Sequence, residues 1–114
     1  MADNRKYYYL KLKENFFDSD SIVLLEDMKD GILYSNILLK LYLKSLKNGG
    51  RLQLDEHIPY TAQMIATLTR HQIGTVERAL AIFQQLGLVE QLDCGLLYMT
   101  DIELKIGRAS CRER

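Results

Sequence analysis

The sequence has 114 residues, of which 47% are hydrophobic and 26% are charged, a size and composition that fit one small globular domain. Its 15 basic and 15 acidic side chains give a formal net charge of zero, so overall charge offers no argument for a nucleic-acid partner. No apolar run reaches the roughly 20 residues that span a membrane, and the N-terminus does not resemble a signal peptide. We therefore expect a cytoplasmic protein that has no membrane partner.

Residues 6–13 alternate in the manner of a half-buried strand. One face carries Tyr8, Leu10 and Leu12, and the other carries Tyr9, Lys11 and Lys13. The polar segment 18–21 then supplies N-cap residues for a short helix that begins near Ile22 and ends at Gly31. The domain is thus expected to open with a strand and a short helix.

The segment 32–47 has apolar residues around almost its whole circumference, which predicts a helix buried on most sides. Its polar residues recur every three or four positions and form one narrow stripe, made of Asn36, Lys40, Lys44 and Lys47. Residues 48–50 end this helix in a turn, and residues 51–54 alternate like a short strand.

Two further helices are predicted at 61–68 and 73–86, joined by a tight turn, which is the pattern of a helix-turn-helix. Residues 88–92 and 96–100 flank Asp93-Cys94-Gly95, which fits a three-residue hairpin loop. With the short strand after the central helix as a third strand, this order predicts a mostly helical α+β fold. We interpret it as a winged helix-turn-helix with an additional N-terminal strand and short helix.

Residues 105–114 are expected to be a non-native tail. Read as codons, the segment 106–114 resembles translated read-through of a common sequencing adapter, and it has no apolar periodicity. An ordinary coding sequence that continues with other codons would refute this interpretation. We therefore assign the domain to residues 1–104 and leave the tail out of the fold prediction.

Three segments resemble the N-terminal domain of phage replisome organisers, relatives of the DnaD-type primosomal proteins of Gram-positive bacteria. They are the aromatic opening at 6–17, the helix end and turn at 43–48, and residues 86–90. The similarity runs from residue 5 to about residue 104. The resemblance implies a DNA replication initiation protein in the cytoplasm of a bacterial host, which binds double-stranded origin DNA and forms a homo-oligomer. It also implies recruitment of the replicative helicase or its loader, through a C-terminal region that this sequence lacks.

The second helix of the helix-turn-helix is the candidate DNA-reading element. Gln72, Thr75 and Arg78 are spaced three residues apart, and Arg70 lies in the turn before them. We expect these side chains to face water, on the side of the helix opposite the apolar stripe of Val76, Leu80 and Phe83. Arg and Gln make bidentate contacts with base edges, and Thr contacts a base or a phosphate. A helix face that is merely solvated explains the same pattern.

The densest basic patch consists of the lysine stripe and the arginine that follows it, namely Lys40, Lys44, Lys47 and Arg51. These cations fit phosphate binding, but a mostly buried helix also needs one edge in water, and lysine suits that edge. Glu90 and Asp93 place carboxylates on the predicted wing, where phosphate binding requires cations. That leaves DNA recognition by the helix alone, or a domain used for self-association while DNA is bound elsewhere.

The N-terminal strand is the candidate oligomer interface, formed by Tyr7, Tyr8, Tyr9 and Leu10. An exposed aromatic edge strand pairs readily with another subunit. Stacking of these tyrosines on unpaired bases is the alternative.

No catalytic, cofactor-binding or metal site is predicted. His57 and His71 are the only histidines, neither lies at a recognised metal-ligand spacing, and phosphate-loop and nucleophile motifs are absent. Without the tail, Cys94 is the only thiol, so no disulfide framework is expected. We expect a non-enzymatic module. A winged-helix transcriptional repressor and a protein-interaction module that never contacts bases are the alternatives to a role in replication.

Overall fold

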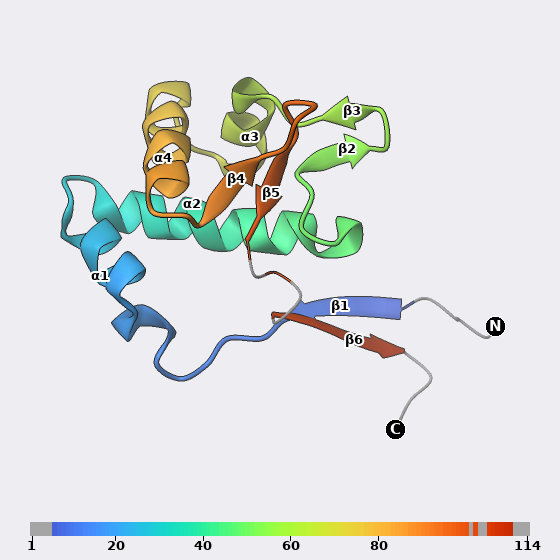
Figure 1. Ribbon diagram of the computed structural model, residues 1–114, viewed down its shortest axis with the longest axis horizontal. Coiled ribbons are helices and arrows are strands. Elements are labelled where there is room, and N and C mark those ends of the chain that lie inside the picture. The colour runs from blue at the N-terminus through green and yellow to red at the C-terminus, as the bar shows by residue number, and fades with distance from the viewer. Residues whose placement is uncertain (1–5, 101, 103–104, 111–114) are drawn as a thin grey trace.

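The computed structural model describes residues 6–100, 102 and 105–110, and it confirms a mainly helical α+β chain (Figure 1). The α-helices of this part are α1 (Asp20–Asp27), α2 (Gly31–Ser45), α3 (Ala62–Thr69) and α4 (Ile73–Gln85). Two-stranded antiparallel sheets pair β1 (Lys6–Leu10) with β6 (Ile106–Ser110), β2 (Gln53–Asp55) with β3 (Ile58–Pro59), and β4 (Val89–Gln91) with β5 (Leu97–Met99). Single 3-10 turns occupy Phe16–Asp18 and Leu46–Asn48. None of the helices in the described ranges has the length and apolar character needed to cross a bilayer.

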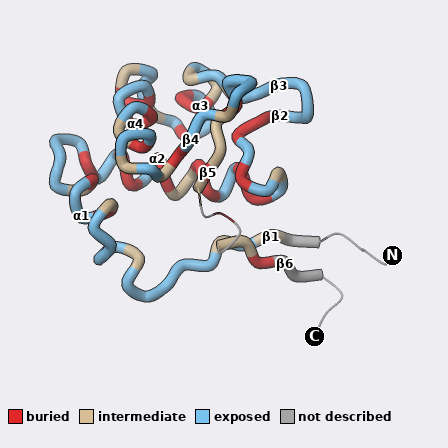
Figure 2. The backbone as a smooth tube through the Cα atoms, viewed as in Figure 1, coloured by how far each residue is buried: buried red, intermediate tan, exposed pale blue. Residues whose placement is uncertain are grey.

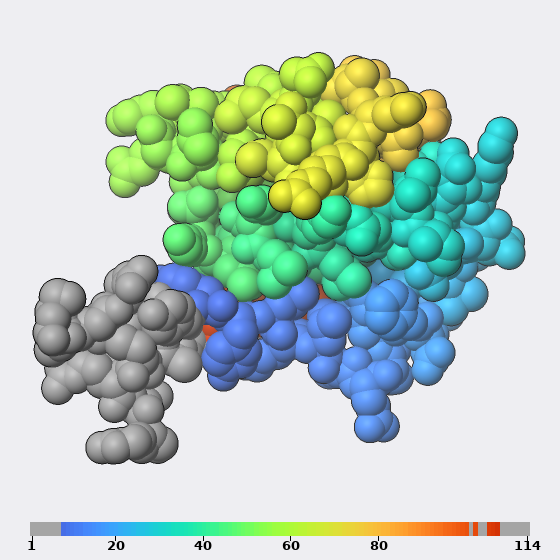
Figure 3. All heavy atoms as spheres, turned by 180° about the vertical axis from the view of Figure 1, so that it is seen from behind, coloured from blue at the N-terminus to red at the C-terminus, as the bar shows by residue number. Residues whose placement is uncertain are grey.

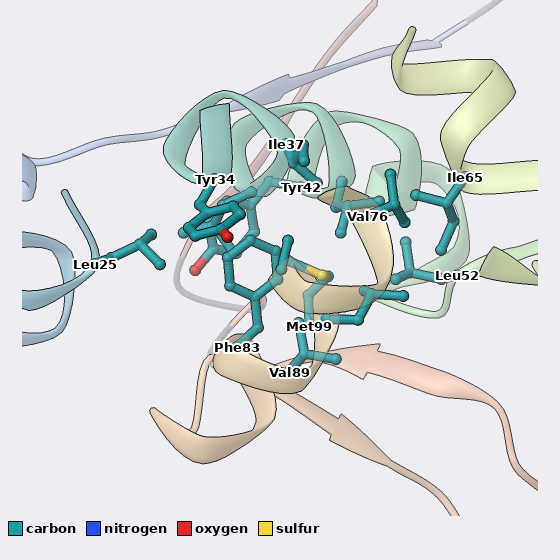
Figure 4. Close-up of a cluster of buried hydrophobic side chains, with 14 of the residues drawn as sticks. Leu25, Tyr34, Ile37, Tyr42, Leu52, Ile65, Val76, Phe83, Val89 and Met99 are labelled. Carbon is teal, nitrogen blue, oxygen red and sulfur yellow. The ribbon is translucent and has the colours of Figure 1, made fainter. Parts of the chain in front are cut away.

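Helix α2 is the centre of the fold because most of its circumference is apolar. Helices α1, α3 and α4 all pack against it, and buried residues gather around it (Figure 2). Its largest buried apolar residues are at most 4% exposed, namely Tyr34, Ile37, Leu38, Leu41 and Tyr42. From the other elements Val76, Phe83 and Met99 point into the same cluster (Figure 4). Each such side chain contributes about 1.5–3 kcal/mol when buried, so this cluster fixes α4 on α2.

Helices α3 and α4 form the predicted helix pair. Helix α3 begins after Thr61, whose Oγ1 accepts a hydrogen bond from the Met64 backbone N–H at 3.2 Å. It ends at Arg70, which adopts the left-handed conformation with φ 64° and ψ 42°. The His71 N–H then donates to the Ala66 carbonyl oxygen at 3.1 Å, which satisfies the end of the helix. The chain passes directly from this turn into α4.

The predicted hairpin is confirmed as β4 and β5, and the predicted third strand is confirmed in part. The Leu52 N–H donates to the Leu97 carbonyl oxygen at 2.9 Å, and the Met99 N–H donates to the Gly50 carbonyl oxygen at 2.8 Å. Residues 50–52 therefore lie along β5 as an added strand-like segment.

The β2–β3 hairpin was not predicted. After residue 52 the chain leaves β5, and Gln53 pairs with Pro59 in a separate hairpin. The His57 N–H donates to Asp55 Oδ1 at 2.8 Å, an Asx turn that reverses the chain. The segment predicted as one strand at 51–54 is thus divided between two pairings.

Strand β1 confirms the predicted alternation in part, because Tyr8 and Leu10 pack against the core while Tyr9 is 50% exposed. The prediction was wrong for Leu12, which lies beyond the end of the strand and is 40% exposed. Its partner was not predicted. Strand β6 lies antiparallel to β1 with Tyr9 opposite Gly107, so the segment left out of the fold prediction forms a strand. Gly107 is buried beneath the Tyr9 ring, and a Cβ atom there would overlap that ring. The non-native origin of residues 105–114 stays a prediction, which the nucleotide sequence tests.

Candidate nucleic-acid interface

The structure contradicts the expectation that Thr75 lies on the exposed outer face of α4. Gln72 and Arg78 are exposed, as expected, but Thr75 is only 7% exposed. Thr75 lies one turn before Ala79, which is fully buried, so its side chain falls on the border of the apolar stripe and turns inward. The exposed face instead includes Glu77 and the side chains further along the helix, namely Ala81, Gln84 and Gln85.

Arg78 is directed back toward the start of α2. Its Nε donates to the Tyr34 hydroxyl at 3.4 Å, and a terminal nitrogen lies 3.9 Å from Asp30 Oδ2. The hydrogen bond with Tyr34 raises the pKa of Arg78, so the guanidinium stays charged. Because the side chains of Arg78 and Asp30 are 58% and 38% exposed, this ion pair is weak and leaves Arg78 accessible.

Arg70 is exposed at the turn between α3 and α4, immediately before the N-terminus of α4. Its guanidinium makes no hydrogen bond or ion pair with any residue that the structure describes. A free cation therefore lies beside the free backbone N–H groups of the first turn of α4, which favours an anion near this turn.

The same turn is attached to α2 by two side-chain contacts. The half-buried Lys40 donates from Nζ to the Thr69 carbonyl oxygen at 2.8 Å. His71 Nε2 lies 2.9 Å from Asn36 Oδ1 and donates to it when Nε2 carries the proton. Partial burial, and then the Lys40 charge, lower the pKa of His71. Lys40 thus differs from the rest of the lysine stripe, because its ammonium group is used to hold the turn.

The remaining basic residues lie along α2 and just after it. Lys44, Lys47 and Arg51 are exposed, and none forms an ion pair with a described residue. Figure 3 shows the α3–α4 connection, in yellow, above α2, in teal, and Lys40 of the lysine stripe contacts this turn. The helical spacing predicted the stripe, whereas nothing local in the sequence predicted the contacts of Lys40 and His71 with their partners.

The candidate oligomer interface lies in β1. Tyr8 and Leu10 face the core, and Tyr9 covers Gly107. The side chain of Tyr7 lies outside the described part of the structure. One edge of β1 pairs with β6, and no strand in the described part of the chain pairs with its other edge.

Clusters of metal-binding side chains do not occur in the part of the chain that the structure describes. Cys94 is an exposed thiol at the tip of the β4–β5 hairpin. Glu90 and Asp93 of this hairpin are exposed as well. The hairpin therefore presents negative charge, in contrast to the cationic face of α2 and the α3–α4 turn.

These features define a class of protein: a small α+β domain with a helix pair and a cationic face. The family model of the N-terminal phage replisome organiser matches residues 9–114, so the chain belongs to this family. Membership indicates a role in phage replication, of the kind performed by initiation factors. No curated protein and no solved structure gives a significant match.

Proposed function

We propose that this domain is a winged-helix module that binds double-stranded DNA at a phage replication origin. The order of its elements supports this, because α2, the strand-like segment 50–52, the helix pair and the β4–β5 hairpin follow the order of a winged helix-turn-helix. Family membership supports the link to replication. The observation that carries the proposal is the exposed guanidinium of Arg70, which has no partner among the described residues and lies beside the N-terminus of α4.

In this proposal the N-terminal half of α4 enters the major groove. Gln72 and Arg78 reach base edges, and Arg70 binds a phosphate next to the helix N-terminus. Lys44, Lys47 and Arg51 add phosphate contacts along the same face. Lys40 acts on binding through the turn that it holds, and the buried Thr75 makes no contact with DNA.

The acidic β4–β5 hairpin stays away from the phosphates. Exposed Glu90 and Asp93 repel the DNA backbone, so recognition depends on α4 and the α3–α4 turn. The same hairpin favours a second candidate function, a protein-interaction module whose hairpin meets a basic partner. Binding of DNA by the isolated chain separates the two candidates.

Self-association is the second part of the proposal. The free edge of β1 pairs with another copy, which multiplies weak DNA contacts through avidity. Analytical ultracentrifugation at micromolar concentration, with and without residues 1–13, tests this. A monomer in both samples refutes it. Recruitment of the replicative helicase or its loader is proposed for the complete replisome organiser.

Fluorescence anisotropy of labelled origin and random duplexes tests DNA binding. Arg70→Gly keeps the left-handed turn but removes the cation, so we expect weaker binding and a salt slope smaller by about one. Lys13→Gln, at an exposed lysine between β1 and α1, is the matched control and leaves both quantities unchanged. Equal effects of the two variants, or no duplex binding, would contradict the proposed function.

A further inference from the structure

A groove separate from the outer face of α4 lies between the end of α2 and the β2–β3 hairpin. Its volume is about 330 Å³, and its lining comes from α2, the following turn, β2 and the residue after β3, namely Leu43, Lys44, Lys47, Asn48, Gln53, Leu54 and Tyr60. Asn48 Nδ2 donates to the Gln53 carbonyl oxygen at 3.3 Å, which holds the two walls together. No acidic residue lines the groove.

The groove contains polar groups that have no partner in the described part of the chain. Lys44 and Lys47 are exposed, lie one helical turn apart and make no ion pair there. Gln53 is only 9% exposed, yet its side-chain amide makes no hydrogen bond with a described residue. No described side-chain nitrogen or oxygen is fully buried without a partner, so this amide keeps some solvent access, and Gln53 lines the groove.

The Gln53 amide offers both a hydrogen-bond donor and an acceptor to a ligand in the groove. The two ammonium groups require an anionic ligand. Half-buried Tyr60 and the apolar walls formed by Leu43 and Leu54 suit a flat group. Phosphate, a hydrogen-bonding edge and a flat face occur together in a nucleotide.

We propose that this groove binds a nucleotide of single-stranded DNA, with its phosphate on Lys44 and Lys47 and its base between Gln53 and Tyr60. The inference rests on the proposed nucleic-acid role of the α2 lysines, but it adds a second site to the duplex contact of α4. An acidic peptide satisfies the lysines and can hydrogen-bond Gln53 through its backbone, but its acidic side chains offer no aromatic face to the Tyr60 ring, so a single DNA strand fits the whole lining better.

The test is fluorescence anisotropy of the 114-residue chain with labelled oligo(dT) of about ten nucleotides, within the site sizes of small single-strand-binding domains. We expect Lys44→Gln with Lys47→Gln to weaken binding and reduce the salt slope by about 1.4, because each phosphate contact to a single strand contributes about 0.7. Gln53→Leu weakens oligo(dT) binding at least threefold without lowering the melting temperature. Lys13→Gln with Lys29→Gln, the matched loss of two exposed lysines, has no effect.

Two outcomes overturn the inference. The first is a failure of the groove to account for binding, seen either as no oligo(dT) binding at all or as equal losses of affinity in the groove and control variants. The other is competition by an oligo-glutamate peptide together with an unaffected Gln53→Leu variant, which assigns the groove to acidic peptides. Duplex binding without oligo(dT) binding refutes the groove alone, whereas oligo(dT) binding without duplex binding refutes the proposed function of α4 alone. Arg70→Gly is expected to weaken only the duplex complex.

Discussion

Arg70 occupies a backbone conformation that favours glycine, which makes Arg70→Gly a sharp test of the α3–α4 turn. At φ 64° and ψ 42°, a residue with a Cβ atom costs about 1–2 kcal/mol relative to its right-handed conformation. Glycine removes this cost but enlarges the conformational entropy of the unfolded chain, a loss of about 0.4–1 kcal/mol. The Arg70 side chain is exposed and has no described partner, so its removal costs no contact. We expect a net gain of about 0.5–1 kcal/mol in the free energy of unfolding.

Urea denaturation and thermal melting followed by circular dichroism measure this gain. It corresponds to an increase of about 2–6 °C in the melting temperature of a domain of this size. Arg70→Ala keeps a Cβ atom and should give no gain, whereas Arg70→Asn should fall between the two. If Arg70→Gly is no more stable than Arg70→Ala, the left-handed turn is wrong. A variant that is more stable but binds duplex DNA less well indicates that the arginine is retained for function at a cost in stability.

Three further predictions concern contacts that fix this face and the terminal strands. Lys40→Met should lower the free energy of unfolding by about 1 kcal/mol in urea denaturation, because a charged hydrogen bond is lost, while Lys44→Met should not. The pKa of His71 is lowered in the folded protein, so the unfolded chain takes up this proton first as the pH falls. The contribution of His71 to the free energy of unfolding should therefore be constant above about pH 6.5, the ordinary pKa of histidine, and decline below it. His71→Gln should remove this part of the decline, and equal pH profiles of the variant and the unmodified protein would contradict the prediction. Gly107→Ala should destabilise the β1–β6 pair by about 1 kcal/mol and increase proteolysis of the N-terminal segment, but it should cost nothing further in a Tyr9→Ala background.

The helices could be predicted from the sequence because each carries a strong apolar stripe. The spacing of Val76, Leu80 and Phe83 predicted α4 and its buried side. The same helical spacing predicted the lysine stripe of α2. The interpretation of Thr75 was wrong because helical periodicity gives the direction of the stripe and not its width. That width depends on how closely α3 and α2 approach α4, which no local pattern records.

The short sheets were harder to predict than the helices. The β2–β3 hairpin depends on one side-chain contact of Asp55. Its second strand has only two residues, one of which is Pro59, so it is too short for an alternating pattern to be recognised. The partner of β1 lies almost a whole chain length away, and its match depends on Gly107 fitting beneath an aromatic ring. The place of Gln53 in the groove depends likewise on the hairpin folding back toward α2.

The pairing of the first strand with the last has a consequence for synthesis of the protein. Strand β1 leaves the ribosome well before β6, because almost the whole described chain lies between the two strands. At about 5–20 residues per second, the tyrosine-rich strand waits roughly 5–20 s for its own partner. During that interval its edge is open to the equivalent strand of a neighbouring nascent chain, so exchange of terminal strands between copies competes with closure within one copy.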